Sequence, residues 1–155
     1  MKKIMIVLGL AMGLITLMSS QCNDSEPDNP DCVGIVSATA SGNVNGNFCF
    51  DKIVEYNFVA NESVNLSVTK EIETKYSCFV SVIPFNGTGT YNCGNGEPGY
   101  VELVFHGEES EFYKPQSGTI TVTQVDDTHF KATFDVVLAG YYNNKTVNFT
   151  GTVSK

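Results

Sequence analysis

Three strand-like runs near the end of the chain, between Ser117 and Ser154, constrain the fold more than any other stretch. Within each run, apolar side chains alternate with polar ones, which is the period of a half-buried β-strand. The apolar positions are Ile120 and Val122 in the first run, Phe130, Ala132, Phe134, Val136 and Leu138 in the second, and Val147, Phe149 and Val153 in the third. Polar turns separate the runs. The pattern predicts an antiparallel meander.

A shared inward face also predicts how these strands pair, because residues directly opposite in an antiparallel pair lie on the same face. The expected cross-strand pairs are Ile120 with Phe134, Val122 with Ala132, and Gln124 with Phe130. This register needs an odd loop around Asp126-Asp127, whereas the connection at 141–144 must be even. Asn143 and Asn144 suit the positive φ angles of a tight hairpin turn.

The rest of the chain from Cys32 onward has the same character, with short alternating runs between Gly, Asn and Pro clusters. Strands are expected at 33–40, 48–50, 53–60, 63–69, 76–82, 88–93 and 100–106. No segment keeps helical spacing over three turns. Residues 32–155 are therefore expected to form a single all-β domain, an antiparallel β-sandwich or closed meander barrel of about 8–10 short strands.

The first 21 residues read as a secretory signal peptide. Met1-Lys2-Lys3 is a positive start, and the apolar stretch from Ile4 to Met18 follows it. That stretch is shorter than the roughly 20 residues that span a bilayer as a helix. The protein is therefore expected to be exported.

Cys22, directly after this segment, resembles the lipidation site of bacterial lipoproteins, whose thiol is acylated and becomes the new N-terminus. Ser19 and Gln21 depart from the usual motif around this cysteine, Leu-Ala-Gly-Cys, although Ser-rich sequences before the cysteine occur in Bacteroidota-type lipoproteins. The alternative is cleavage near Ser20, which leaves Cys22 as a spare thiol. Removing Cys22 leaves an even set of four cysteines, which favours lipidation.

Residues 22–31 are expected to hold this lipidated cysteine and an acidic tether, because the segment has two prolines and no large apolar residue. An acidic stretch at this place resembles the signal that sends such lipoproteins to the cell surface. We expect the membrane to be a partner through the N-terminal lipid anchor, and the location to be the outer membrane or cell surface.

The charge balance excludes one class of partner. Without residues 1–21, the chain loses Lys2 and Lys3 and no acidic residue, so it carries 9 − 2 = 7 Lys against 17 Asp and Glu, a net charge of −10. It has no arginine. Nucleic acid and phosphate recognition depend on cationic side chains, so nucleic acid is not expected as a partner.

The remaining cysteines are Cys32, Cys49, Cys78 and Cys93. In an exported protein, four cysteines predict two disulfides, for which three connectivities are possible. We favour Cys32–Cys49 and Cys78–Cys93, because each pair flanks a plausible hairpin. A zinc site is the alternative, but the chain has no C-x-x-C pair. No cofactor is expected.

Candidate chemistry is sparse. His106 precedes Glu108, Glu109 and Glu111, and His129 follows the Asp126-Asp127 turn. Either histidine with nearby carboxylates suits a general base or a metal ligand. Each is equally an ordinary exposed residue at a strand end. No G-x-S-x-G motif is present, so an enzyme is the less favoured class.

Aromatic side chains on loops suggest glycan binding instead, since aromatic rings stack on sugars. The candidates are Tyr100, Phe112, Tyr113, Tyr141 and Tyr142, and the last two form the aromatic pair most expected to be exposed. The absence of tryptophan argues against a strong platform. Both tyrosines are alternatively caps on the end of the fold.

The second half of the chain resembles a family. Gly87-Thr-Gly-Thr-Tyr91, Ser117-Gly-Thr-Ile-Thr-Val122 and the closing Lys145-Thr-Val-Asn-Phe-Thr-Gly151 look like the small Bacteroidota surface lipoproteins grouped as a domain of unknown function. The likeness covers roughly residues 87–153. Ala132 stands where glycine is usual, and the four cysteines are a further departure. The resemblance implies a β-rich surface lipoprotein and supplies no active residues.

The expected function is therefore that of a lipid-anchored cell-envelope β domain with a non-catalytic binding or structural role, and with a glycan or protein as possible partner. Three alternatives remain: a small hydrolase or metal-dependent enzyme using His106 or His129, a glycan-binding module using Tyr141 and Tyr142, and a barrel holding a small apolar ligand among Phe58, Leu66, Phe105 and Phe134.

Overall fold

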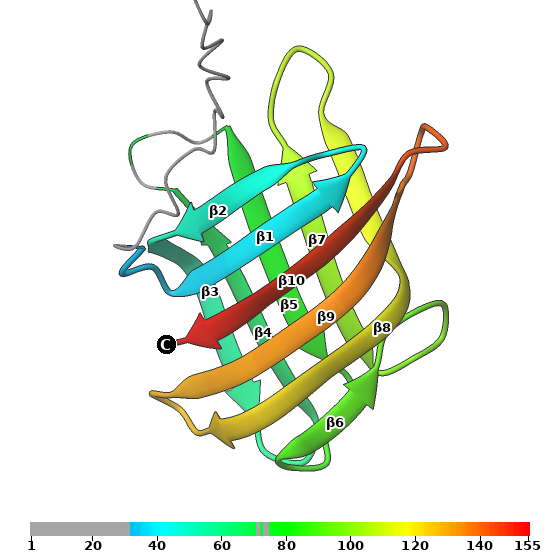
Figure 1. The fold of residues 1–155 in the computed structure, drawn as a ribbon. Helices are drawn as coiled ribbons and strands as arrows, with labels where there is room; N and C mark the ends of the chain where they lie inside the picture. Colours follow the sequence, from blue (N-terminus) through cyan, green and yellow to red (C-terminus); the bar gives the residue numbers. More distant parts are fainter. Residues whose placement is uncertain (1–31, 71, 73–74) are drawn as a thin grey trace, which may run out of the picture.

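The computed structural model describes residues 32–70, 72 and 75–155, so the predicted signal peptide, Cys22 and the tether lie outside the described residues. The described chain is all-β, as predicted. It forms one ten-stranded antiparallel sheet that is nearly closed into a barrel-like shape (Figure 1). The strands are β1 (Val36–Gly42), β2 (Gly46–Phe50), β3 (Lys52–Val59), β4 (Ser63–Thr69), β5 (Tyr76–Val82), β6 (Gly89–Asn92), β7 (Gly99–Phe105), β8 (Glu111–Val125), β9 (Phe130–Gly140) and β10 (Thr146–Ser154).

The strand order is β2-β1-β10-β9-β8-β7-β5-β4-β3, with β6 paired to β8. In Figure 1, β2, β1, β10, β9 and β8 form the layer facing the viewer, and β7, β5, β4 and β3 lie behind it. The long strand β8 belongs to both layers, because Glu111, Phe112 and Tyr113 pair with β7 while later residues pair with β6 and β9. The edge strands β2 and β3 are joined by Asp51 alone.

The predicted meander is β8, β9 and β10, and its apolar sets face inward as expected. Ile120 pairs with Phe134 and Val122 with Ala132, which confirms two of the predicted pairs. The third was wrong, because a bulge at Thr123 shifts the register and places Val125 opposite Phe130. The loop between the paired residues Val125 and Phe130 therefore has four residues, 126–129, and is not odd as expected, because the bulge adds a residue to β8.

The second turn of the meander is even, as predicted, since Gly140 N donates to Lys145 O at 2.9 Å across residues 141–144. The expected positive φ angles at Asn143 and Asn144 were wrong. Among the described non-glycine residues, Asn61 has a positive φ, of 59°. It lies in the turn between β3 and β4, where the sequence predicted a turn.

Strand β8 begins six residues earlier than expected. The register shifts between Pro115 and Ser117, so Gln116 is an extra residue and the inward parity changes there. Tyr113, before the bulge, and Ile120, after it, consequently both face the core although they differ in parity. A proline is tolerated at such a point because a bulge already interrupts the ladder.

The core is continuous across both layers and is rich in aromatic rings. The Phe48 ring on β2 lies 5.1 Å from Tyr76 on β5, 5.9 Å from Phe105 on β7, and 6.0 Å from Phe149 on β10. Edge-to-face ring pairs of this kind add stability beyond the buried area. An edge strand is thus fastened across the interior by side chains.

The first predicted disulfide is present: Cys32 and Cys49 are bonded, with Cα atoms 5.7 Å apart. The second pairing is corrected, because Cys78 and Cys93 are separate buried thiols. Cys78 faces the core from β5, whose neighbours are β4 and β7, whereas Cys93 lies at the end of β6, which pairs with β8. Burial raises the pKa of both thiols, that of Cys93 to about 12, which disfavours the reactive thiolate form.

Gly151 fills an inward position of β10 directly opposite Phe134 of β9. A Cβ atom at this glycine would lie 2.5 Å from Phe134 Cζ, 2.6 Å from Ser37 O and 2.8 Å from Ala38 Cβ. Its φ is not in the left-handed region, so the requirement for glycine here is purely steric. The ring of Phe134 occupies the space that a side chain would need.

We predict that Gly151→Ala lowers the free energy of unfolding by about 1–3 kcal/mol, as overpacking of a core does. The measurement is the shift of the urea midpoint. The matched control is Gly107→Ala, whose added Cβ would lie 3.8 Å from Glu109 O, an ordinary van der Waals contact. Equal midpoints for the two variants would contradict the steric reading.

Candidate functional site

Tyr141 and Tyr142 lie at the tip of the β9–β10 hairpin and are exposed, by 60% and 78% respectively. Their rings meet edge to face, with centroids 4.6 Å apart. The predicted exposure is therefore confirmed, and a cap on the end of the fold is not their arrangement. The loop placement of the other three aromatics was wrong, because Tyr100 lies in β7, and Phe112 and Tyr113 lie in β8, where Tyr113 is fully buried.

Backbone and side-chain contacts hold this hairpin tip in place. Tyr141 N donates to Phe112 O at 2.8 Å, which ties the tip to β8. Asn143 Oδ1 accepts a hydrogen bond from Lys145 N at 3.0 Å. The ammonium of Lys114 lies 4.2 Å from the centroid of the Tyr141 ring. One face of Tyr141 is thus occupied by a cation, and Tyr142 offers the more open ring.

A hollow of about 460 Å³ opens beside Tyr142, between this hairpin and the β7–β8 loop. We call it the tyrosine hollow; it is lined by Glu109, Ser110, Glu111, Phe112, Tyr142 and Asn143. It combines aromatic rings with carboxylate, hydroxyl and amide groups. Such a set offers a flat apolar face and several hydrogen-bond acceptors to one ligand.

Glu111 is held in place by two partners. Its Oε1 is 3.1 Å from Lys145 Nζ, and its Oε2 accepts a hydrogen bond from the Tyr113 hydroxyl at 2.9 Å. These contacts, chiefly the one with Lys145, lower the pKa of Glu111, and the same ion pair raises the pKa of Lys145. Glu111 is therefore an ionised, oriented acceptor at the rim of the hollow.

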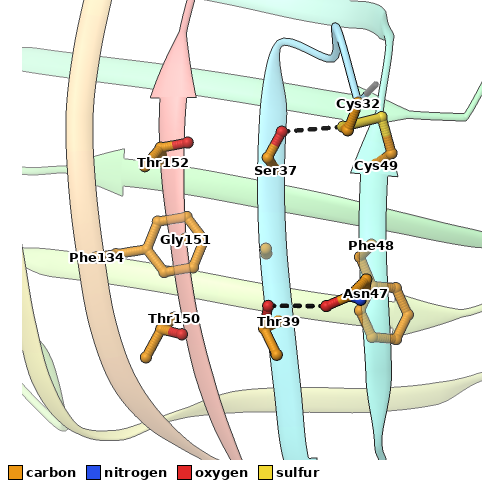
Figure 2. Close-up of a pocket in the computed structure, with 11 residues that line it drawn as sticks. Cys32, Ser37, Thr39, Asn47, Phe48, Cys49, Phe134, Thr150, Gly151 and Thr152 are labelled. Carbon is orange, nitrogen blue, oxygen red and sulfur yellow. Dashed lines mark hydrogen bonds between the residues drawn. A yellow bond between two sulfur atoms is a disulfide. The ribbon is translucent and has the colours of Figure 1, made fainter. Parts of the chain in front are cut away.

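A larger hollow, of about 500 Å³, lies on the outer face of β2, β1 and β10. Figure 2 shows Ser37 and Thr39 on β1, flanked by Thr150 and Thr152 on β10 and by Asn47 and Cys49 on β2. Cys32 Sγ lies 2.9 Å from Ser37 Oγ, and Thr39 Oγ1 donates to Asn47 Oδ1 at 3.0 Å. We call this the hydroxyl hollow.

The hydroxyl hollow has no charged residue in its lining, although the chain is strongly acidic. Sequence reasoning missed it. The alternation of Thr and Ser with apolar residues was visible in each strand. The sequence did not show that β1 lies between β2 and β10, because this arrangement pairs the first strand of the domain with the last.

The two histidines lie at the two ends of the 15-residue strand β8, and neither is in one of the two hollows. His129 belongs to the β8–β9 turn, where Asp126 Oδ1 accepts hydrogen bonds from the backbone N of Thr128 and of His129 at 2.7 and 2.8 Å. The Thr128 hydroxyl donates to the same oxygen at 2.7 Å, and this bond, together with the backbone bonds, holds the pKa of Asp126 well below its usual range. Asp126 thus shapes a turn.

His106 follows β7, and its Nε2 lies 3.0 Å from Ser77 Oγ. In the part of the chain that the structure describes, no group of three or more His, Cys, Asp or Glu is placed to hold a metal ion. Leu66 and Phe134, expected to line an apolar ligand cavity, are instead packed in the core. The expected pairing of His129 with a carboxylate is present, because His129 Nδ1 lies 3.0 Å from both Asp126 Oδ1 and Asp126 Oδ2, but the pair is exposed and lies outside both hollows. Leu66 and Phe134 do not form the predicted apolar cavity.

Comparisons with protein-family models, curated proteins and solved structures find no match to this chain. Among the described residues, no helix has the length and apolar character needed to cross a membrane. The candidate site accordingly stands on its own geometry.

We predict that Lys145→Gln raises the pKa of Glu111 toward its ordinary value of 4.5. Because the pKa of Glu111 is lower in the folded state, its ionisation stabilises the folded state at pH values above 4.5. This contribution to stability is lost as the pH falls through the pKa of the folded state. Carboxyl NMR titration measures the change. An unchanged Glu111 titration in the variant would show that Lys145 is not the main cause.

Proposed function

We propose that this protein is a lipid-anchored cell-envelope domain that binds uncharged glycan chains at the tyrosine hollow, without catalysing a reaction. The observation that carries the proposal is the exposed Tyr142 ring, packed edge to face against Tyr141, beside a hollow with oriented acceptors. An aromatic side chain has only two χ angles and loses little conformational entropy when a ligand covers it.

The chemistry of the hollow favours a neutral polyhydroxylated ligand. Sugar hydroxyls donate hydrogen bonds to carboxylates and amides, and Glu109, Glu111 and Asn143 supply these groups. Glu109 and Glu111, within a chain of net charge −10 after signal removal, repel anionic ligands such as sulfated or uronic-acid glycans. The expected selectivity is therefore for uncharged glycans.

Hydrolysis of such a glycan is less favoured by the same residues. Glycoside hydrolases commonly need one carboxyl group with a raised pKa that donates a proton to the leaving group. The pKa of Glu111 is lowered by Lys145 and Tyr113, which makes this group unsuited to that role. An enzyme using Glu109 or a histidine remains the second candidate, and a release assay on the bound glycan distinguishes it.

We predict that Tyr142→Ala weakens binding of a neutral oligosaccharide by roughly 2 kcal/mol, about thirtyfold in Kd, as loss of a central aromatic anchor does. A glycan array identifies the ligand, and calorimetry on the purified protein gives the Kd. Tyr142→Phe keeps the ring and is the matched control, with near-native affinity expected. Retained affinity in Tyr142→Ala would place the site elsewhere, and the hydroxyl hollow would be tested next.

The anchor is a separate part of the proposal, supported by the sequence of residues 1–22. We predict that the N-terminal peptide of the exported protein carries acyl chains on Cys22 and that the protein sediments with membranes. Cys22→Ser is expected to lose both the acyl mass and the lipid-dependent sedimentation. A variant with the same mass, mobility and membrane association as the unaltered protein would refute lipidation.

A further inference from the structure

Most of the large exposed aliphatic side chains of the domain gather at one end of the fold. Val33, Ile53, Val54 and Ile72 are exposed by 95%, 37%, 64% and 89%. We call these four residues the anchor-end patch. Exposed aliphatic groups that gather in one place mark an interaction surface more than single ones do.

The connectivity of the fold explains why the four residues share an end. Val33 follows Cys32, which the disulfide joins to Cys49 near the end of β2, and Asp51 leads directly from β2 into β3. Ile53 pairs with Val68 near the end of β4. Ile72 is three residues beyond Thr69, the last residue of β4, so it lies within about 10 Å of that strand end.

We propose that the anchor-end patch lies on the lipid bilayer, with its aliphatic side chains in the boundary between headgroups and acyl chains. This proposal rests on the anchoring of Cys22. The tether between Cys22 and Cys32 is short, with nine intervening residues, and spans about 35 Å at most when extended. A domain of this size is itself roughly 35 Å across, so the end that carries Cys32 is the one held against the membrane.

Other occupants fit the patch less well. The tether itself has no large apolar residue with which to cover it. A second copy pairing along edge strand β3 is opposed by the bulge at Val54, between Ile53 and Glu55, because bulges interrupt the edge that a partner strand needs. Both Lys52 and the acids Asp51 and Glu55 border the patch, so contact is expected with uncharged lipid as well as with anionic lipid.

The contact sets the orientation of the proposed binding site. β1 begins beside the disulfide and ends opposite Val147, next to the β9–β10 hairpin (Figure 1). Its seven residues span on the order of 20 Å. Measured along β1, the hairpin that carries Tyr142 therefore lies at the opposite end from the disulfide.

The chain has no tryptophan, so one introduced tryptophan reports its own surroundings. The test places Val54→Trp in the full lipidated protein, reconstituted in phosphatidylcholine vesicles with bromine near the headgroup end of the acyl chains. An interfacial side chain lies about 5–10 Å into the boundary, within contact of this quencher, so a loss of tryptophan fluorescence relative to unbrominated vesicles is expected. Val33→Trp is the second reporter, in case the change at Val54 disturbs the bulge.

The matched control is Ile83→Trp, at a side chain of similar exposure, 54%, beyond the far end of β5. It is expected to show no quenching. Unquenched Val54→Trp and Val33→Trp in vesicles that carry the protein would overturn the membrane contact and leave anchoring intact. Quenching of all three variants would overturn it as well, because no particular face would then be held. Protein that fails to float with the vesicles would refute the anchor, and the membrane contact with it.

Discussion

The aromatic contacts of Phe48 across the interior hold this fold together where backbone pairing does not. The described sheet is a path that ends at β2 and β3, and no ladder between the described residues of those two strands is present. Phe48 instead carries β2 onto β5 and β7, through Tyr76 and Phe105. This packing joins the β2 edge to the opposite layer, whereas β1 is held by its ladder with β10.

On the opposite side of the opening, β3 is held by a second set of contacts. The Tyr56 hydroxyl donates to Asp126 O at 2.6 Å, and Lys155 Nζ lies 3.8 Å from the centroid of the Tyr56 ring. Burial, with the nearby Asp126 and Asp127, raises the pKa of Tyr56 to about 12. The hydroxyl thus stays a donor through the physiological range, and the β8–β9 turn fastens the sheet edge.

The sequence was sufficient for the strands and insufficient for the bulges. Alternation in β8, β9 and β10 predicted the inward face and two cross-strand pairs, since burial of one face tolerates no slip. The extra residues at Gln116, Thr123 and Val54 look like ordinary strand residues, because a bulge changes the pairing partner and not the residue type. The bulge at Thr123 is the reason that the predicted pairing of Gln124 with Phe130 failed.

The sites divide in the same way. The exposure of Tyr141 and Tyr142 followed from their polar neighbours in a turn. Their hollow did not, because Glu109 and Ser110 come from another loop. Likewise, the spacing of Cys78 and Cys93 suggested a hairpin between them, whereas β6 crosses away from β5 to pair with β8. Local sequence shows which face a residue takes, and the order of strands shows which residues meet.

The meeting of the first and last strands has a consequence for engineering. β1 pairs with β10 along its whole length, and Ser154 N donates to Ile35 O at 2.8 Å, so the two ends of the domain lie side by side. A short linker between them would give a circular chain, which can be reopened at an exposed turn such as 61–62. For the same reason the whole domain can be inserted into a surface loop of another protein.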